Sequence, residues 1–388
     1  MQIGEESRDS MGNLDTTISK DDTKVLKAIA VLLMLMHHLW YFPERIYGGG
    51  LQFRFWIFEE PATVFLGRFG QICVSFFFFL GGYGVYSAQR GKPYDVVDRL
   101  KKLYIPYWKV FFVFVPIGFL FCSNQPDYVE EWAIYGVFSN FYLYKFLQNL
   151  FGITCTYNWE WWFLSSYAAA LIIFPTVRAV IENKKPRTNL FLLVTASILI
   201  SNVVPALGKI KGLESLQDDG LFQTLFCLRA PEIASFWMGC VCAENGLLDR
   251  LRAAAGKAGL LNPLMDLAAW AAAMFLRMAT FGPVLDVFLI PVLCVTSLDL
   301  LRHLKGTKKV LLCIGEESTN MWLIHTFFCY YFFGVVKIVV APKWAVPSLL
   351  VLILLSYGAS VALTWFWKGV SALWQKVRRI WNGAYSKT

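Results

Sequence analysis

Long apolar runs recur along the whole chain, and they constrain its fold more than any other feature of the sequence. A run of about eighteen or more predominantly apolar residues is the length that an α-helix needs to cross the hydrocarbon core of a bilayer. The chain has 388 residues, of which 57% are hydrophobic and only 16% are charged, more apolar surface than a soluble domain of this length needs. The sequence therefore predicts an all-α, polytopic integral membrane protein.

Ten transmembrane helices can be placed on these runs. Their ranges are 25–42, 69–88, 104–122, 159–179, 190–207, 223–243, 260–277, 281–301, 318–341 and 345–367. The aromatic segment 129–152 carries charged residues, so we interpret it as an amphipathic element lying against the bilayer. We expect residues 1–22 to form a disordered cytoplasmic tail, 23–370 the ten-helix domain, and 371–388 a basic cytoplasmic tail.

The distribution of positive charge predicts the orientation of these helices. With a cytoplasmic N-terminus, 25 of the 36 lysines and arginines fall in inner segments, and nine fall in outer segments or outer span ends. Because lysine and arginine accumulate in cytoplasmic loops, this bias favours both termini in the cytoplasm. Cationic loops facing an anionic leaflet of the lipid bilayer also account for the net charge of +9 without a nucleic-acid partner. The nine cysteines show no metal-ligand spacing with histidine, so we expect no metal site.

The first predicted span carries a lysine and a histidine in helical register. Lys27 and His38 are separated by about three helical turns, so they share one face and lie about 16 Å apart along the axis. An ionisable group inside the membrane indicates a functional site. The alternative is that His37 and His38 only anchor the helix at the interface, as Trp40 and neighbouring aromatic residues do.

A cationic loop precedes the third predicted span. It carries five lysines and arginines within residues 90–102, among them Arg99, Lys101 and Lys102. These side chains either form an ordinary positive-inside loop or bind the phosphates of a charged cofactor, for which arginine and lysine are natural ligands.

Two further spans contain polar residues with two possible roles. Arg229 and Glu232 are three residues apart on the sixth span, where they can form a structural ion pair or face a substrate. His325 lies about two turns after Ser318 on one face of the ninth span. It is either a hydrogen-bonded core residue or part of a catalytic site.

Aromatic residues cluster at the start of the fourth span. Trp159, Glu160 and Trp161 belong to this cluster at the predicted outer face. The indoles fit an interfacial aromatic belt. They also resemble a carbohydrate platform, in which indole faces pack against sugar C–H groups and a carboxylate binds hydroxyls.

Taken in order, these motifs resemble those of the membrane acyltransferase 3 family, whose members acylate surface glycans and small acceptors from acyl-coenzyme A. The matching stretches are Lys27-x10-His38, 76–83 (similar to FFxxSGY), 99–106 (similar to RxxRI), 229–239 (similar to RxPExxxFxxG) and 318–325 (similar to SxxIYLxH). Three positions depart from the pattern: Gly81 replaces a serine, and Lys27 and Lys102 occupy positions that are frequently arginine. Neither lysine can make a bidentate phosphate contact.

The resemblance implies a membrane O-acyltransferase, most simply an O-acetyltransferase using acetyl-coenzyme A, in a bacterial cytoplasmic membrane. The acceptor would be a carbohydrate or cell-surface glycan on the outer side. The cofactor-binding residues would be Lys27, Arg99, Lys101, Lys102 and Tyr83. The catalytic residues would be His38, His325 and Glu232, and the acceptor-binding residues would be Arg229, Glu160, Trp159 and Trp161.

Two questions stay open at the level of sequence. His38 could act as a general base on the acceptor hydroxyl, or it could carry the acyl group as a covalent intermediate. The alternative to an enzyme is a transporter or acyl-group translocator, since helices interrupted by glycine and intramembrane charges would also serve a carrier.

Overall fold

The computed structural model describes residues 18–47, 51–57, 59–125, 137–207, 210, 230–279, 283–304 and 306–385. Within these residues the fold is helical, apart from a two-stranded hairpin of β1 (Trp56–Ile57) and β2 (Glu60–Pro61) and one isolated bridge. The predicted all-α class is therefore confirmed. The long helices are α2 (Lys20–Trp40), α4 (Ile72–Gln89), α5 (Val96–Phe121), α7 (Trp162–Glu182), α8 (Pro186–Leu207), α11 (Ala230–Asn245), α13 (Pro263–Ala279), α14 (Asp286–His303), α15 (Thr307–Thr326) and α17 (Ala345–Tyr385).

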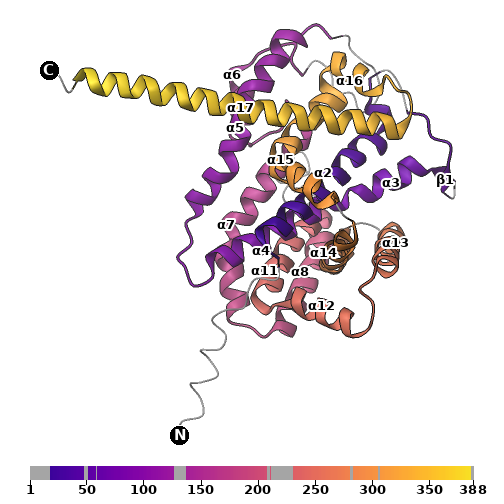
Figure 1. Cartoon of the computed structure of the whole chain (residues 1–388). Helices are drawn as coiled ribbons and strands as arrows, with labels where there is room; N and C mark the ends of the chain where they lie inside the picture. Colours follow the sequence, from indigo (N-terminus) through magenta and orange to yellow (C-terminus); the bar gives the residue numbers. More distant parts are fainter. Residues whose placement is uncertain are drawn as a thin grey trace.

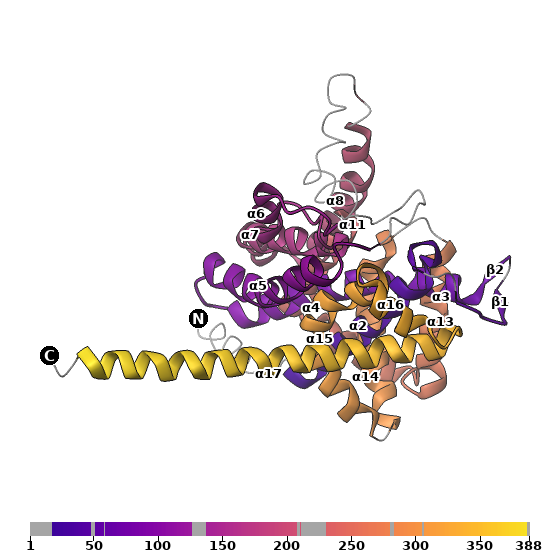
Figure 2. The same ribbon diagram turned by 90° about the horizontal axis from the view of Figure 1, so that it is seen from above.

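Shorter elements join the long helices. They are the helices α3 (Ala62–Gly70), α6 (Leu143–Leu150), α12 (Leu247–Lys257) and α16 (Phe333–Val340), the 3-10 turns η1 (Pro43–Arg45), η2 (Trp159–Trp161) and η4 (Pro283–Leu285), and the π-helical turn η5 (Phe327–Tyr331). Figure 1 shows α2, α4 and α15 inside the bundle, whereas α17 crosses its surface and extends beyond it. Figure 2 shows that α17 stays straight along this path.

The length and apolarity of five helical segments are sufficient to cross a membrane. They are Lys20–Trp40, Ala62–Gln89, Val96–Phe121, Trp159–Glu182 and Ala345–Arg379, and a bent pair of segments, Thr307–Tyr331 and Phe333–Val340, makes a sixth if it is one span. Several of these helices turn large apolar side chains outward, including Phe112, Leu120, Leu350 and Leu354. An apolar exterior of this kind suits lipid, so the chain is a multi-pass membrane protein.

Helix α5 begins earlier than the sequence indicated. Asp95 caps it, because its carboxylate accepts a hydrogen bond of 3.0 Å from the backbone N–H of Asp98. The predicted loop cations Arg99, Lys101 and Lys102 therefore lie in the first two turns of a helix, and the loop interpretation is wrong for them. A helix N-terminus favours anions. The three cations and the N-terminus of α5 therefore create a region of positive potential together.

The predicted ninth span is also not straight. The chain bends by 90° between η5 and α16. Gln125 satisfies the backbone groups that this break exposes, since its side chain donates to the Tyr331 carbonyl at 2.8 Å and accepts from the Phe333 N–H at 2.7 Å. Irregular backbone at membrane depth needs such partners.

Glycines let the central helices approach one another closely. A Cβ on Gly239 of α11 would collide with the backbone of α4 at Phe79, and a Cβ on Gly315 of α15 would collide with the backbone of α2 at Lys24. Small residues permit such backbone contact between membrane helices. The second contact holds α15 against α2, and so brings the His325 helix beside the His38 helix.

The two predicted tails differ in how far the structure describes them. Most of residues 1–22 lies outside the described residues, and α2 begins at Lys20. At the other end, α17 continues as a helix through the predicted basic tail to Tyr385. Its 41 residues correspond to about 61 Å, about twice the thickness of a hydrocarbon core, so the helix extends past any bilayer it crosses.

Candidate active site

One cavity of about 270 Å³ connects the two residues that the sequence placed in register. Its wall includes both Lys27 and His38 of α2. Arg99 and Lys102 of α5 line the same cavity, and we call these two residues and Lys27 the cationic rim. Between the rim and His38 the wall is largely apolar, with contributions from Met34, Val74, Phe77, Leu103, Phe163 and Trp322.

The cationic rim is the more accessible part of this wall. Lys102 is exposed and pairs with Asp98 one turn earlier at 2.6 Å, whereas Lys27 and Arg99 are half-buried. An exposed pair of this kind contributes little stability, so Lys102 can exchange its partner for a ligand at little cost. Lys101 is exposed but does not line the cavity.

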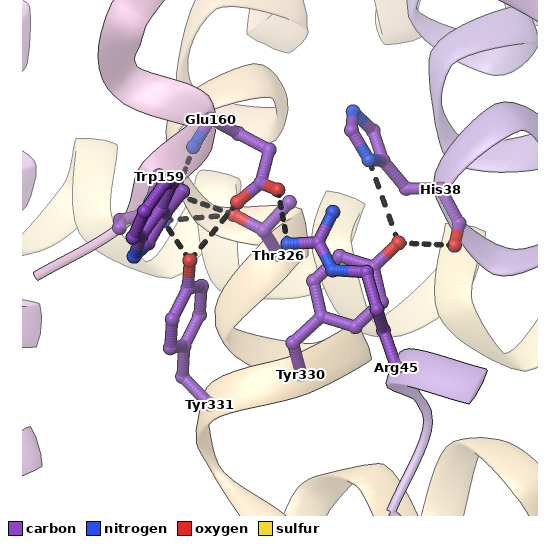
Figure 3. Close-up of polar contacts among 8 residues, drawn as sticks. His38, Arg45, Trp159, Glu160, Thr326, Tyr330 and Tyr331 are labelled. Atoms are coloured by element: carbon purple, nitrogen blue, oxygen red, sulfur yellow. Dashed lines mark hydrogen bonds and ion pairs between the residues drawn. The ribbon is translucent and has the colours of Figure 1, made fainter. Parts of the chain in front are cut away.

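The tandem histidines have different environments. His37 is buried, and its Nδ1 lies 2.8 Å from the carbonyl oxygen of Gly67 in α3. His38 faces the cavity and contacts Tyr330 of η5, whose hydroxyl donates to the His38 carbonyl oxygen and lies 3.5 Å from its Nδ1 (Figure 3). Because the Tyr330 hydrogen is used by the carbonyl, its oxygen can accept from Nδ1–H, which leaves Nε2 of His38 as the basic nitrogen.

A second imidazole lies beside His38. The ring of His325 is fully buried, and its centroid is 5.0 Å from that of His38. Nδ1 of His325 donates to the Trp322 carbonyl at 2.8 Å, so Nε2 carries the lone pair. Within the described residues this Nε2 has no hydrogen-bond partner. The structure thus places the two histidines of separate sequence motifs side by side.

Glu160 borders the cavity as one half of an ion pair. Its Oε1 lies 2.6 Å from Nη2 of Arg45, and the Tyr331 hydroxyl donates to Oε2 at 3.1 Å (Figure 3). Arg45 also stacks on Tyr330, with Cζ 4.1 Å from the ring centroid. Burial is the largest single influence on the pKa of Arg45 and lowers it, but the charge and hydrogen bond of Glu160, together with Tyr330 and Tyr331, raise the pKa above its ordinary value.

Sequence reasoning missed Arg45, Tyr330 and Tyr331. Arg45 counted only as one of the outer cations, and the two tyrosines belonged to a span that was expected to be straight. The aromatic run around them was the available signal, but helical periodicity does not show which tyrosine a π-helical turn directs inward.

The remaining residues that the sequence predicted for the site are distributed over different parts of the chain. Tyr83 is buried in the core against Phe79, away from the cavity wall. Trp161 is also buried, and its indole donates to the Leu323 carbonyl, whereas Trp159 is 59% exposed. Arg229 lies outside the described residues, and Glu232 belongs to α11 with its side chain outside the described part. The predicted Arg229–Glu232 pair is therefore not described.

The fold and this site define a multi-pass membrane protein with a buried histidine site connected to a cationic rim. A family model described as an acyltransferase domain matches residues 22–366, nearly the whole chain. The chain belongs to this family, acyltransferase 3, and is a membrane acyltransferase. No match was found among the curated proteins or among the solved structures.

Proposed function

We propose that the protein is an O-acyltransferase that moves an acyl group from acyl-coenzyme A, most simply acetyl-coenzyme A, to a carbohydrate hydroxyl. One observation carries this proposal: a single cavity has the cationic rim in one part of its wall and His38 in another. The two parts are about 16 Å apart along α2. That distance is comparable to an extended pantetheine arm.

The cationic rim supplies the chemistry that the donor's phosphates require. Lys27, Arg99 and Lys102 carry positive charge, and the N-terminus of α5 adds to it. Lys101 increases the local potential from outside the cavity wall. The apolar middle of the cavity suits the uncharged pantetheine arm, which would bring the thioester to His38.

His38 is the base of the proposed reaction. Its Nε2 takes the proton of the acceptor hydroxyl while the hydroxyl oxygen attacks the thioester carbonyl carbon. The carbon–sulfur bond then breaks, and the coenzyme A thiolate takes the proton back from His38. In the covalent alternative, Nε2 attacks the thioester carbonyl carbon first, the carbon–sulfur bond breaks and the coenzyme A thiolate leaves. The acceptor hydroxyl oxygen then attacks the acyl-imidazole, the carbon–nitrogen bond breaks, and the hydroxyl proton passes to the thiolate. His325, whose ring centroid lies 5.0 Å from that of His38, would orient the His38 ring in both cases.

The acceptor would approach from the end of the cavity that holds His38 and Glu160. The exposed indole of Trp159 next to Glu160 suits a sugar, which packs its C–H face against aromatic rings. The bias of positive charge supports both termini in the cytoplasm. The rim would then face the cytoplasm, and the acceptor would be a glycan on the outer side.

Acyl transfer by the purified protein tests this proposal. The assay measures release of coenzyme A thiol from acetyl-coenzyme A with and without a carbohydrate acceptor. We expect acceptor-dependent release by the wild type and none by His38→Ala, with His303→Ala, a half-exposed imidazole of α14, as the matched control. Full transfer by folded His38→Ala would contradict the assignment, and transport without thiol release would favour a carrier.

Calorimetry tests the placement of the donor. Lys102→Ala and Arg99→Ala should weaken binding of acyl-coenzyme A, because each removes a phosphate ligand. Lys92→Ala is the matched control, since Lys92 is an exposed lysine that does not line the cavity. Equal affinity in all three variants would exclude the rim as the phosphate site.

A further inference from the structure

We propose that Arg45 is a catalytic residue whose guanidinium binds the reacting carbonyl oxygen and stabilises the negative charge that develops there. The inference rests on the proposed acyl transfer and adds a group to it that the sequence motifs do not include. It follows from the position of Arg45, from its fixed orientation and from the charge that the reaction generates.

Arg45 is held in place on two sides. Its Nη2 is bound by Glu160 at 2.6 Å, and the plane of the guanidinium lies over the ring of Tyr330, with Cζ 4.1 Å from the centroid. Tyr330 is the residue that contacts Nδ1 of His38. One aromatic ring therefore orients both the cation and the imidazole, so their relative geometry is fixed before a substrate binds.

One terminal nitrogen of Arg45 is not used by these contacts. Figure 3 shows the second terminal nitrogen pointing into the space between the Glu160 carboxylate and the His38 ring. Glu160 and His38 both line the cavity. Arg45 is not itself part of the cavity wall, but this nitrogen points between two residues that are, so it would lie next to a thioester bound at His38. Glu160 already holds Arg45 through the other terminal nitrogen. The second nitrogen can therefore bind an oxygen there without a movement of the side chain.

The proposed reaction generates negative charge at this position. When the acceptor oxygen attacks the thioester carbonyl carbon, His38 receives the hydroxyl proton and the carbonyl π electrons move to the carbonyl oxygen. That oxygen becomes an anion until the carbon–oxygen double bond re-forms and the carbon–sulfur bond breaks. A preorganised cation in a low-dielectric site stabilises such an oxyanion more than it stabilises the neutral carbonyl, and so lowers the barrier.

The assignment does not depend on which nucleophile acts first. If His38 attacks the thioester and forms an acyl-imidazole, the same carbonyl oxygen becomes negative in that step and again in the second. Arg45 would serve both steps. Its effect is therefore expected on the turnover number, whichever pathway operates.

A purely structural ion pair is the competing explanation, and kinetics can separate the two. Arg45→Gln should lower kcat on the order of 100-fold, the usual effect of removing one oxyanion donor. KM for acyl-coenzyme A and its affinity by calorimetry should stay near wild type, because the cationic rim is intact. Arg68→Gln is the matched control: its partner Glu60 does not line the cavity, whereas Glu160, the partner of Arg45, does, and kcat should not change.

Loss of Arg45 leaves Glu160 as an unpaired charge, so a second variant protects the test against misfolding. Arg45→Gln/Glu160→Gln is neutral at both positions and should fold with the same low kcat. Added guanidinium should restore part of kcat in Arg45→Ala, which a structural role would not predict. Wild-type kcat in the folded double variant, or a raised KM at unchanged kcat, would overturn the role of Arg45.

The outcomes also separate this inference from the function on which it rests. No transfer by the wild type would refute the acyl transfer, and the role of Arg45 with it. Transfer by the wild type that is equally fast in the Arg45 variants would refute the role of Arg45 alone.

Discussion

Two arginine–carboxylate pairs lie in the interior of the described part of the chain, and their surroundings differ. Arg277 of α13 pairs with Asp286 at the start of α14 at 2.9 Å, with side chains 4% and 0% exposed. Arg45 and Glu160 pair at 2.6 Å with side chains 15% and 7% exposed, and Glu160 borders the cavity. In the first pair, hydrogen-bond donors of the protein enclose the carboxylate. In the second pair, the carboxylate borders a cavity that a ligand can enter.

The contrast shows how one interaction can serve two purposes. A closed ion pair whose charges are satisfied by neighbouring helices stabilises the packing of those helices relative to a broken pair. An ion pair beside a cavity instead holds a charged donor in a fixed orientation where substrate can reach it. Variants of the Arg277–Asp286 pair should therefore change stability, and variants of the Arg45–Glu160 pair should change the rate of transfer.

The largest expected effect is on stability at the closed pair. Asp286→Ala removes the carboxylate that lies 2.9 Å from Arg277 in the interior, which should lower the free energy of unfolding by about 4 kcal/mol. Thermal unfolding in detergent, together with the yield of folded protein, measures the loss. A decrease below about 1 kcal/mol would show that Arg277 finds another partner, and the contrast between the pairs would fail.

A smaller loss is expected from the hydroxyl that supports the same carboxylate. Ser75 of α4 donates to Asp286 at 2.6 Å. Ser75→Ala should cost about 2 kcal/mol, the typical contribution of a hydrogen bond to a charged group. Thermal unfolding reports this loss, while the transfer rate of the folded protein should equal that of wild type. A reduced rate at unchanged stability would connect the closed pair to the active site.

At the cavity pair the expected effect is on rate. Glu160→Gln keeps the size of the side chain but removes the charge that pairs with Arg45, so Arg45 is oriented less firmly. We expect kcat to fall about tenfold, which corresponds to about 1.4 kcal/mol in the barrier. Steady-state kinetics with acetyl-coenzyme A measures the change. Unaltered kcat would indicate that Glu160 does not orient Arg45 during the reaction.

The smallest effect should come from replacing the whole closed pair. Arg277→Met/Asp286→Leu exchanges two charges for apolar groups of similar volume, and such exchanges are often neutral or stabilising. We expect the free energy of unfolding to stay within about 1 kcal/mol of wild type and the transfer rate to persist. The matched Arg45→Met/Glu160→Leu protein should fold but transfer slowly. Equal activity of the two double variants would remove the distinction between the pairs.

Part of the site could be predicted from local sequence alone. Lys27 and His38 belong to one helix, so their shared face follows from helical geometry, and the structure places both on one cavity wall. The order of the motifs likewise indicated the family, and the family model confirms it. Each of these predictions depends on residues close together in the chain or on their order along it.

The contacts that complete the site could not be predicted in this way. Arg45 and Glu160 are 115 residues apart, and Tyr330 and His38 are 292 residues apart. Which of several loop cations meets which carboxylate depends on how the helices pack, and helical periodicity carries no information about that. The start of α5 was missed because its first turns are too polar for an apolar run to include them.

The sequence by itself determined the helical membrane character, the register of Lys27 with His38 and the family, because apolar length, helical repeat and motif order are properties of the linear chain. Only the tertiary structure decided that His325 lies beside His38, that Glu160 is held by Arg45, and that the chain breaks after Tyr331 to direct two tyrosines inward. These features depend on the close packing of α2 against α15 and on backbone groups that distant side chains satisfy. Such contacts exist only once the helices have assembled.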